Sequence, residues 1–573
     1  MTVPATPAFD ADALFARLAA DDWAWRLSEF PQLATSVGDA SHDDRLERVD
    51  AASRAGRLAR WRATREALAA IPVAEMSAAA RIDRAVFDNQ LHGFIAAAES
   101  HADRMPLNSD SSFYGPLVDL GDVQPLRDVP EYRRFIARLA DIPRFLREHI
   151  DLLREGLATG YTVPGAVLAG RDQPLAAIAA LDDATLTPFW KPFVAFPAGV
   201  PEPERGPLQD AARQVIAEHV LPAYRELLAF LRDVYVPGAR TTTAACDLPD
   251  GHAFYAAQIR QYTTLPLTAD EIHQRGLQEV ARILAEMRGV MRDAKFDGDL
   301  PAFLHFLRTD AQFYARTPHE LLAHASWIAK RIDGLLPKYF GVLPRQPYGV
   351  APVPEDIAPF YTTGRYAPAP QPTGFSGMYW VNTHALESRA LCTLPALTLH
   401  EAVPGHHLQI ALAAEQGGQP AFRRHGFVDA YGEGWALYAE HLGNEMGVYL
   451  TPYEQFGRLT YEMWRAARLV VDTGLHAKRW SRERARAYLL EHTALSEHEV
   501  ATEVDRYVSW PGQALSYKIG ELTLRGLRAR AEARLGARFD LRAFHDAVLA
   551  LGSVPLGLLE AQVDAWIAQR LAA

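Results

Sequence analysis

The chain has 573 residues, of which 49% are hydrophobic and 23% charged, and its net charge is −11. This is the composition of a globular protein with a large core, and its acidity argues against general nucleic-acid binding. The two cysteines, Cys246 and Cys392, exclude a disulfide framework and favour a reducing compartment. The first residues lack a secretory signal, and no run approaches the roughly 18 apolar residues of a membrane-spanning helix. We therefore expect a cytoplasmic protein with no membrane partner, unless a leader has been removed.

Most of the chain has the apolar spacing of amphipathic helices. The helices predicted before residue 336 lie at about 10–36, 43–71, 76–104, 129–158, 207–235, 268–294 and 317–335. Pro207 is suited to the first turn of its helix. Thr268 and Glu271 have the capping-box pattern of a helix start. Turn residues predict loops at 106–116 and 197–203.

The segment 336–372 is rich in Pro, Gly and Tyr, so no long helix is expected there. It is either a linker between two lobes or an irregular segment over a cleft. Residues 374–383 have the composition of a β-strand. As an edge strand it could bind an extended peptide, with Tyr379 touching the substrate; the alternative is a structural strand in a small sheet. From Glu387 onward the pattern is helical again, with Thr451 as a capping residue.

A cluster of metal-binding residue types lies in the segment 399–409, whose sequence is LHEAVPGHHLQ. Catalytic zinc is usually held by three protein ligands, such as imidazole nitrogens and carboxylate oxygens. The common helical motif is His-Glu-x-x-His, but Pro404 stands where the second His would be and interrupts an ideal helix. On an undistorted helix His407 would return to the face of His400, whereas a Pro-Gly bulge would bring in His406. The spacing alone allows either histidine as the second metal ligand, and we favour His406.

A second segment with acidic residues follows at 431–440. Glu433 lies between two glycines, which allow another backbone or a ligand to come close. A carboxylate buried among aromatic neighbours needs a partner such as a metal, so Glu433 is the predicted third ligand; the alternative is a solvated helix face. Glu440 lies on the same face of the predicted helix. It could accept the N–H of a histidine ligand or pair with an arginine.

These motifs resemble a bacterial family described as domain of unknown function 885. The segments that carry the resemblance are 23–39, 400–406, 431–438 and 511–520. The signature at 400–406 is His-Glu-x-x-Pro-Gly-His. Because the resemblance spans nearly the whole chain, we treat 1–573 as one family-wide unit with approximate lobes at 1–335 and 336–573. The family is similar to gluzincin-like metallopeptidases.

The resemblance implies a mainly α fold, a two-lobed helical metallopeptidase-like body around a deep cleft, with a small β-sheet near the metal site. It also implies that His400, His406 and Glu433 hold Zn²⁺ and that Glu401 is the general base. Tyr517 would stabilise the oxyanion, as a tyrosine or histidine from a C-terminal helix does in helical metallopeptidases. The alternative for Tyr517 is an ordinary core residue.

Arg465 and Arg468 form a polar stripe with Asp472 and His476 on an otherwise apolar helix. Their guanidinium groups could bind a substrate carboxylate, to which the planar fork of arginine is well matched. They could equally form a buried ion-pair network.

The predicted function is a zinc-dependent hydrolase, best described as a metallopeptidase of oligopeptidase or carboxypeptidase type. It would cleave short peptides with a zinc-bound water activated by Glu401. One alternative is a metal-dependent hydrolase of a non-peptide amide or ester, and another is a non-catalytic helical binding protein. The expected partner is a short peptide or small amide substrate, and a homodimer stays open. The sequence has no serine-hydrolase elbow and no phosphate-binding loop motif.

Overall fold

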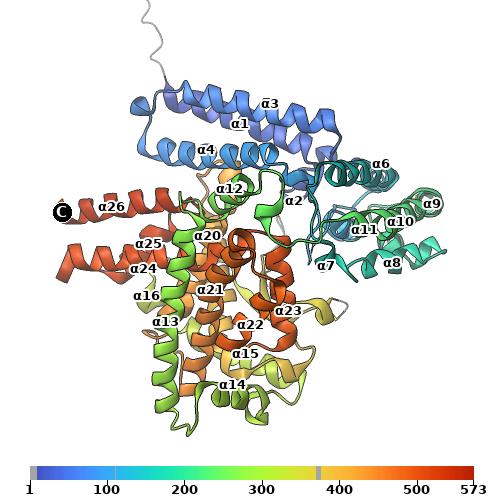
Figure 1. The fold of residues 1–573 in the computed structure, drawn as a ribbon. Helices are drawn as coiled ribbons and strands as arrows, with labels where there is room; N and C mark the ends of the chain where they lie inside the picture. Colours follow the sequence, from blue (N-terminus) through green and yellow to red (C-terminus); the bar gives the residue numbers. More distant parts are fainter. Residues whose placement is uncertain (1–9, 110, 356, 369–375, 573) are drawn as a thin grey trace, which may run out of the picture. The chain divides into compact units, whose positions relative to one another are not determined.

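The computed structural model describes residues 10–109, 111–355, 357–368 and 376–572. Within these ranges the fold is mainly helical with one small β-sheet, as predicted (Figure 1). Contacts divide the chain into two compact units, which are described separately. Unit 1 comprises Met1–Thr243, Asp247–Phe254 and Pro420–Phe422, and unit 2 comprises Ala244–Cys246, Tyr255–Gln419 and Arg423–Ala573.

The division between the units lies between residues 243 and 255, and not near residue 335 as the predicted lobes had it. The physical reason is the packing of α13 (Ala269–Asp293) along α21 (Pro452–Lys478). Gly276 of α13 allows this close contact, because a Cβ there would lie 2.8 Å from the Cβ of Leu469. The helices after residue 255 therefore belong to the same core as the C-terminal helices.

Unit 1 is a set of helices in which α6 is the longest. Its helices are α1 (Ala11–Glu29), α2 (Pro31–Ser36), α3 (Ala51–Ala69), α4 (Ala78–Glu99), α5 (Leu120–Val123), α6 (Val129–Thr159), α7 (Gly165–Leu168), α8 (Gln173–Ala179), α9 (Glu202–Val215), α10 (Leu221–Phe230) and α11 (Val236–Gly238). The fully buried Arg138 of α6 donates hydrogen bonds to the carbonyls of His42 and Arg45 and pairs with Asp43 at 3.3 Å. These bonds satisfy its buried charge and fix the segment between α2 and α3.

Three of the helix predictions for unit 1 need correction. The segment 10–36 is two helices, because Phe30 precedes Pro31 and leaves the helical region. The helix predicted from residue 43 begins only after Asp50, whose side chain accepts the backbone N–H of Ser53. Pro207 does not start its helix: α9 begins at Glu202, and Pro207 lies inside it.

Unit 2 holds the small sheet and the helices around it. Its elements are α13, α14 (Leu300–Thr309), α15 (Pro318–Asp333), α16 (Leu336–Tyr339), β1 (Tyr348–Pro352), β2 (Gly364–Ala367), β3 (Gly377–Val381), α17 (Leu394–Glu401), α18 (His406–Glu415), α20 (Asp429–Leu442), α21, α22 (Arg482–His492), α23 (Glu497–Ser509), α24 (Ser516–Leu535), α25 (Leu541–Leu549) and α26 (Leu556–Ala572). Two further helices, α12 (Gly251–Thr263) and α19 (Ala421–Arg424), contain residues of both units. The capping boxes at Thr268 and Thr451 are present, as predicted.

The sheet has the order β1-β3-β2, with β1 parallel and β2 antiparallel to β3. The predicted strand at 374–383 is β3, although residues 374 and 375 lie outside the described residues. Its prediction as an edge strand was wrong, because β1 and β2 pair with both of its edges. Tyr379 is fully buried and its hydroxyl lies 3.3 Å from Thr398 Oγ1 of α17, so it packs the sheet onto that helix. The Tyr379 side chain is therefore not accessible to a substrate.

Two glycines let α20 and α24 pack with their backbones in contact. A Cβ on Gly434 would lie 2.5 Å from the Cα of Gly520, and a Cβ on Gly520 would lie 1.9 Å from the carbonyl oxygen of Ala430. This contact places the start of α24, with Tyr517, against the helix that carries Glu433. The glycines on either side of Glu433 were expected to let another backbone or a ligand come close. At Gly434 the group that comes close is the backbone of α24.

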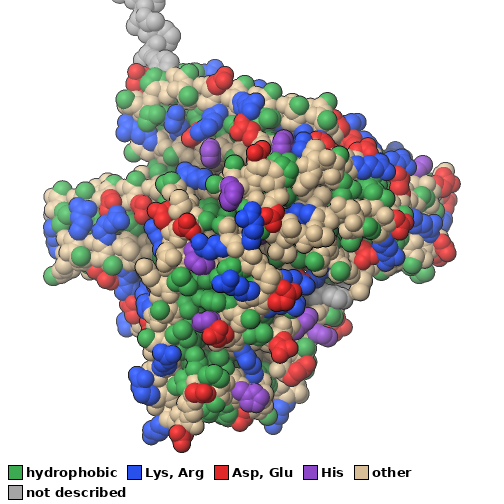
Figure 2. Space-filling view, in the orientation of Figure 1, with side chains coloured by type: hydrophobic (Ala, Val, Ile, Leu, Met, Phe, Trp, Pro, Cys, Tyr) green, Lys and Arg blue, Asp and Glu red, His purple; other side chains and the backbone are tan. Residues whose placement is uncertain are grey.

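The visible face of the molecule carries mixed charges. On the face shown in Figure 2, Lys and Arg side chains are interspersed with Asp and Glu over the described residues, without a wide area of one sign. No helix among the described residues is long and apolar enough to cross a bilayer.

Candidate metal centre

The His-Glu motif lies where α17 ends and α18 begins. The helix stops at Glu401, a turn of four residues follows, and α18 starts at His406. Two contacts hold the turn: the N–H of His407 donates to the carbonyl of Ala402 at 3.1 Å, and Trp435 Nε1 donates to the carbonyl of Pro404 at 2.8 Å. The predicted interruption at Pro-Gly is confirmed, and it is a complete break between two helices.

The break brings the side chains of His400, His406 and Glu433 together. Glu433 Oε2 lies 3.5 Å from His400 Nε2 and 3.4 Å from His406 Nε2. One potential ligand atom from each residue lies within 4.8 Å of the other two. Among the described residues this is the one such group of three or more His, Cys, Asp or Glu side chains. Two imidazoles and a carboxylate form a common ligand set of catalytic zinc.

The protonation and hydrogen bonding of Glu433 agree with a cation-binding role. Burial favours the neutral carboxyl, but the charge of His406 and the close approach of both imidazoles hold the pKa of Glu433 well below its usual value. Its Oε2 atom is buried and has no conventional hydrogen bond among the described residues. An anionic oxygen facing two imidazole nitrogens in this way fits a shared cation.

His400 is oriented from behind by Glu440. Its Nδ1 lies 2.8 Å from Glu440 Oε1, and both side chains are buried. Burial opposes a charge on His400, but its contact with Glu433 and its hydrogen bond with Glu440 outweigh the effect of burial and raise the pKa of His400 to about 9. Arg465 Nη2 also lies 3.8 Å from Glu440 Oε1. Glu440 therefore makes both contacts considered for it, with a histidine N–H and with an arginine.

Glu401 is fixed by the edge strand β2. The backbone N–H of Tyr366 donates to Glu401 Oε2 at 2.8 Å, and the carboxylate is buried with 9% of the residue exposed. Since Glu401 directly follows His400, its carboxylate belongs to the same helix end as the clustered imidazole. Its position is compatible with a base that acts on a bound water.

His407 lies apart from this cluster. Its Nδ1 is 3.0 Å from the hydroxyl of Tyr366, and its ring packs against Tyr348 at a centroid distance of 4.7 Å. Burial lowers the pKa of His407 to about 4, so the ring is neutral. Its contacts are those of a core histidine between α18 and the sheet, and the structure groups His406, not His407, with His400.

Tyr517 is surrounded by arginine side chains. Its hydroxyl lies 3.5 Å from Arg506 Nη2, and the guanidinium of Arg468 stacks 4.3 Å from the centre of its ring. Only 7% of Tyr517 is exposed. The phenol of Tyr517 is thus held between two guanidinium groups.

Arg465 and Arg468 are buried and occupied by protein groups. Arg465 stacks on Tyr461 and Trp464, and Arg468 binds the hydroxyl of Tyr507 at 2.9 Å and pairs with a glutamate carboxylate at 2.9 Å. Their side chains are 6% and 2% exposed. The prediction that they bind a substrate carboxylate is not supported by this geometry; they form the buried network that was the alternative.

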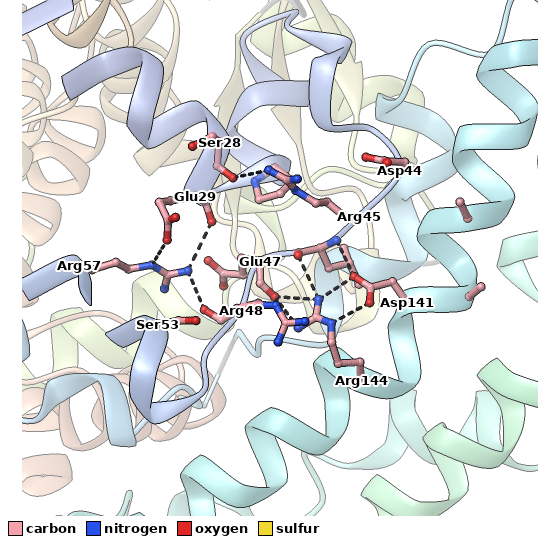
Figure 3. Close-up of a pocket in the computed structure, with 14 residues that line it drawn as sticks. Ser28, Glu29, Asp44, Arg45, Glu47, Arg48, Ser53, Arg57, Asp141 and Arg144 are labelled. Atoms are coloured by element: carbon pink, nitrogen blue, oxygen red, sulfur yellow. Dashed lines mark hydrogen bonds and ion pairs between the residues drawn. The ribbon is translucent and has the colours of Figure 1, made fainter. Parts of the chain in front are cut away.

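Unit 1 contains a different polar feature, a pocket of about 510 Å³ (Figure 3). Its walls carry several charged side chains that bind one another. Arg144 pairs with Asp141 at 2.6 Å and donates to the carbonyl of Glu47, and Arg57 donates to Glu29 Oε2 at 3.1 Å. No histidine or cysteine lines this pocket. It is a solvated ion-pair cluster and lacks the ligand types gathered in unit 2.

The comparison with known proteins places the chain in a family. Residues 31–563 match the model of a family described as "Bacterial protein of unknown function (DUF885)". The chain belongs to this family. No curated protein matches it.

Two solved structures resemble this DUF885 protein over nearly its full length. One is the crystal structure of "the putative lipoprotein from Colwellia psychrerythraea", with a TM-score of 0.90, 27% identity, and 98% of this chain and 100% of that chain covered. The other is "a putative lipoprotein of unknown function from Shewanella oneidensis", with a TM-score of 0.71, 19% identity, and 96% and 99% covered. The second likeness shows the fold alone. The predicted relation to gluzincin-like metallopeptidases stays a prediction.

Several polar residues beside the site of this DUF885 protein were missed by sequence reasoning. Asp429 lies one helical turn before Glu433 on α20; burial, with the charge of Glu433, raises its pKa to about 6. Gln513 Oε1 accepts a hydrogen bond from Arg506 at 2.9 Å. The spacing of Asp429 and Glu433 was a usable signal, whereas nothing local in sequence marks Gln513 or Arg506.

Proposed function

We propose that this protein is a metal-dependent hydrolase, best described as a zinc metallopeptidase that cleaves short peptides. The observation that carries the proposal is the convergence of His400 Nε2, His406 Nε2 and Glu433 Oε2, with Glu401 next to the first of them. Two imidazoles, one carboxylate and an adjacent carboxylate outside the ligand set are the parts that such a site requires.

The residues of this chain have distinct roles in the proposal. A bound zinc ion would polarise the scissile carbonyl and make water easier to ionise. Glu401 takes a proton from the attacking water and passes it to the leaving amine. The N–H of Tyr366 holds Glu401 Oε2 in place at 2.8 Å, and Tyr517 donates its phenolic hydrogen bond to the oxyanion that forms at the substrate carbonyl.

The surroundings of these residues agree with such roles. Glu440 fixes the tautomer of His400 by accepting from Nδ1, which leaves Nε2 as the metal-binding atom. Arg468 stacks under the ring of Tyr517 and keeps it in one orientation. Part of the His406 and Glu433 side chains remains exposed, at 12% and 16%, so the group is reached from solvent. A two-lobed metallopeptidase body with a deep cleft is part of this proposal.

The test combines metal analysis with substrate profiling. The protein is loaded with Zn²⁺, and a mixed peptide library, a set of simple esters and a set of non-peptide amides are offered with and without chelator. The proposal predicts one zinc per chain and chelator-sensitive peptide cleavage that returns when zinc is added back. Cleavage of esters or non-peptide amides alone would favour the second hydrolase class. Zinc-free protein that cleaves nothing would favour a helical binding protein.

Location is a separate proposal. We propose a cytoplasmic protein on the composition of the sequence, whereas the two solved relatives are both described as putative lipoproteins. For this chain that description suggests lipid attachment as the competing possibility. Fractionation of cells that express the natural gene decides between them: recovery in the cytosolic fraction supports our proposal, and recovery in detergent-extracted membranes contradicts it.

A further inference from the structure

The arginine side chains near Glu401 and Tyr517 that a ligand can reach indicate which class of substrate would bind. Arg465 and Arg468 do not qualify, because protein groups enclose them. Two other arginines of unit 2, Arg365 and Arg506, retain solvent access: Arg506 contacts the Tyr517 hydroxyl at 3.5 Å, and Arg365 lies on the strand that holds Glu401.

Arg365 lies on β2 immediately before Tyr366, whose backbone N–H holds Glu401. Side chains alternate along a strand: Tyr366 points to His407, so Arg365 leaves the strand on the other face. Its side chain is exposed. Neighbouring atoms partly desolvate the guanidinium, but a hydrogen bond with Tyr361 and the charges of Glu401 and Tyr517 outweigh this and raise its pKa. Arg365 is therefore a charged, accessible group within electrostatic reach of Glu401.

Arg506 reaches Tyr517 from a different element, α23. Its guanidinium is held by Gln513 Oε1 at 2.9 Å and faces Glu503 at 3.7 Å and the Tyr517 hydroxyl at 3.5 Å. One fifth of the side chain is exposed. The contacts with Gln513 and Glu503 fix the orientation of the guanidinium before any ligand arrives, which lowers the entropic cost of binding an anion.

We propose that Arg365 and Arg506 bind the terminal carboxylate of the substrate, and that the enzyme releases the C-terminal residue of short peptides. A guanidinium matches a carboxylate with two parallel hydrogen bonds, and two such groups on separate elements select substrates whose chain ends beside Glu401 and Tyr517. The inference rests on the proposed hydrolase function.

The reaction balances with water as the other reactant. The C–N bond of the last peptide linkage breaks, the hydroxyl of water is added to the carbonyl carbon, and the leaving nitrogen gains a proton. The products are a peptide shortened by one residue, with a new carboxylate, and a free amino acid whose original carboxylate stays at the two arginines until release. No oxidant, reductant or further co-reactant is needed.

The experiment compares an N-terminally blocked alanine peptide with the same peptide amidated at its C-terminus. We expect wild-type kcat/KM for the free acid to exceed that for the amide at least tenfold. Arg365→Gln and Arg506→Gln should each lower kcat/KM for the acid about tenfold or more, mainly through KM, and lower kcat/KM for the amide much less, so that the acid-to-amide ratio falls. Arg365→Lys should recover part of the loss. The matched control is Arg316→Gln, at an arginine of unit 2 whose side chain is 88% exposed. It should change kcat/KM for neither the acid nor the amide.

Binding is measured separately, so that the result does not depend on turnover alone. Calorimetric titration of the Glu401→Gln protein should show tighter binding of the acid than of the amide, and Arg365→Gln in that background should remove the difference. Zinc content and circular dichroism of each variant check that the centre and the fold are intact. Equal cleavage of acid and amide by the wild type, or equal losses on both, would overturn the inference and leave a hydrolase. Absence of zinc and of any cleavage would overturn the proposed function with it.

Discussion

Glu440 Oε1 lies 2.8 Å from His400 Nδ1, in a contact between two buried side chains. Because this bond fixes which ring nitrogen carries the proton, Glu440 should contribute to metal affinity without touching the metal. Glu440→Ala is expected to weaken zinc binding about 10–100-fold, and Glu440→Gln, which keeps an acceptor oxygen, should weaken it less. Competition with a chromogenic chelator measures both. Equal zinc affinity of wild type and Glu440→Ala would show that Glu440 does not contribute to metal binding.

Substitution of Glu401 is the clearest way to separate zinc binding from catalysis. In Glu401→Gln the side-chain oxygen can still accept the N–H of Tyr366, but it can no longer take a proton. We expect hydrolysis to fall by about 10²–10⁴ while zinc content is unchanged. The readouts are kcat on the best library peptide and zinc per chain by atomic spectroscopy. Retained activity would exclude Glu401 as the base.

The contact between α20 and α24 should be intolerant of any side chain at Gly434. A methyl group there would meet the backbone of Gly520 at 2.5 Å, and forced overpacking costs about 1–3 kcal/mol or more. Gly434→Ala should therefore lower the melting temperature and, by moving α24, reduce activity. Gly526→Ala on the same α24 is the control, since no atom lies within 4 Å of the added methyl group. It should stabilise the helix by about 1 kcal/mol, and similar losses in both variants would contradict the account.

Asp472 should make stability depend on pH. Its carboxyl is fully buried, accepts from Tyr255 at 2.6 Å and from the N–H of Gly512, and burial raises its pKa to about 7. A raised pKa means that the folded chain holds this proton while the unfolded chain has lost it. The stabilisation is therefore complete below about pH 4 and disappears as pH rises to about 7, by up to about 4 kcal/mol.

Asp472→Asn removes this titration. Compared with wild type, the variant should become progressively more stable between pH 5 and pH 8, as read from melting temperatures at both values. The exposed Asp297 of unit 2 is the control, and Asp297→Asn should show no such trend. A constant difference between Asp472→Asn and wild type at both pH values would contradict the raised pKa.

The sequence predicted the grouping of His400, His406 and Glu433 better than it predicted the surrounding architecture. His400, Glu401, Glu433 and Glu440 were chosen from residue type and spacing, because helical periodicity places chemically matched groups on one face. The choice of His406 over His407 depended on how far the Pro-Gly break turns the chain. Periodicity does not give that rotation; the contacts of Trp435 with Pro404 and of His407 with Ala402 set it.

The errors have a common cause in long-range pairing. Tyr379 was placed on an edge strand because a single strand pattern does not reveal its neighbours, and β1 and β2 come from a segment that reads as irregular. Arg465 and Arg468 were considered for the substrate because the planar fork of arginine matches a carboxylate, and the alternative, a buried network, could not be chosen from sequence because Glu440 and Tyr507 are distant along the chain. Arg365 and Arg506, which we propose as substrate-binding residues, were not predicted because neither occurs in a recognisable motif.

Zinc stoichiometry of three proteins tests the central claim most directly. The wild type, His406→Gln and His407→Gln differ at two neighbouring histidines, of which only His406 lies with His400 and Glu433, whereas His407 contacts Tyr366. After zinc loading and removal of weakly bound ions, we predict one zinc per chain in the wild type and in His407→Gln, and none in His406→Gln. Stoichiometric zinc in His406→Gln, or none in the wild type, would contradict the metal centre proposed here.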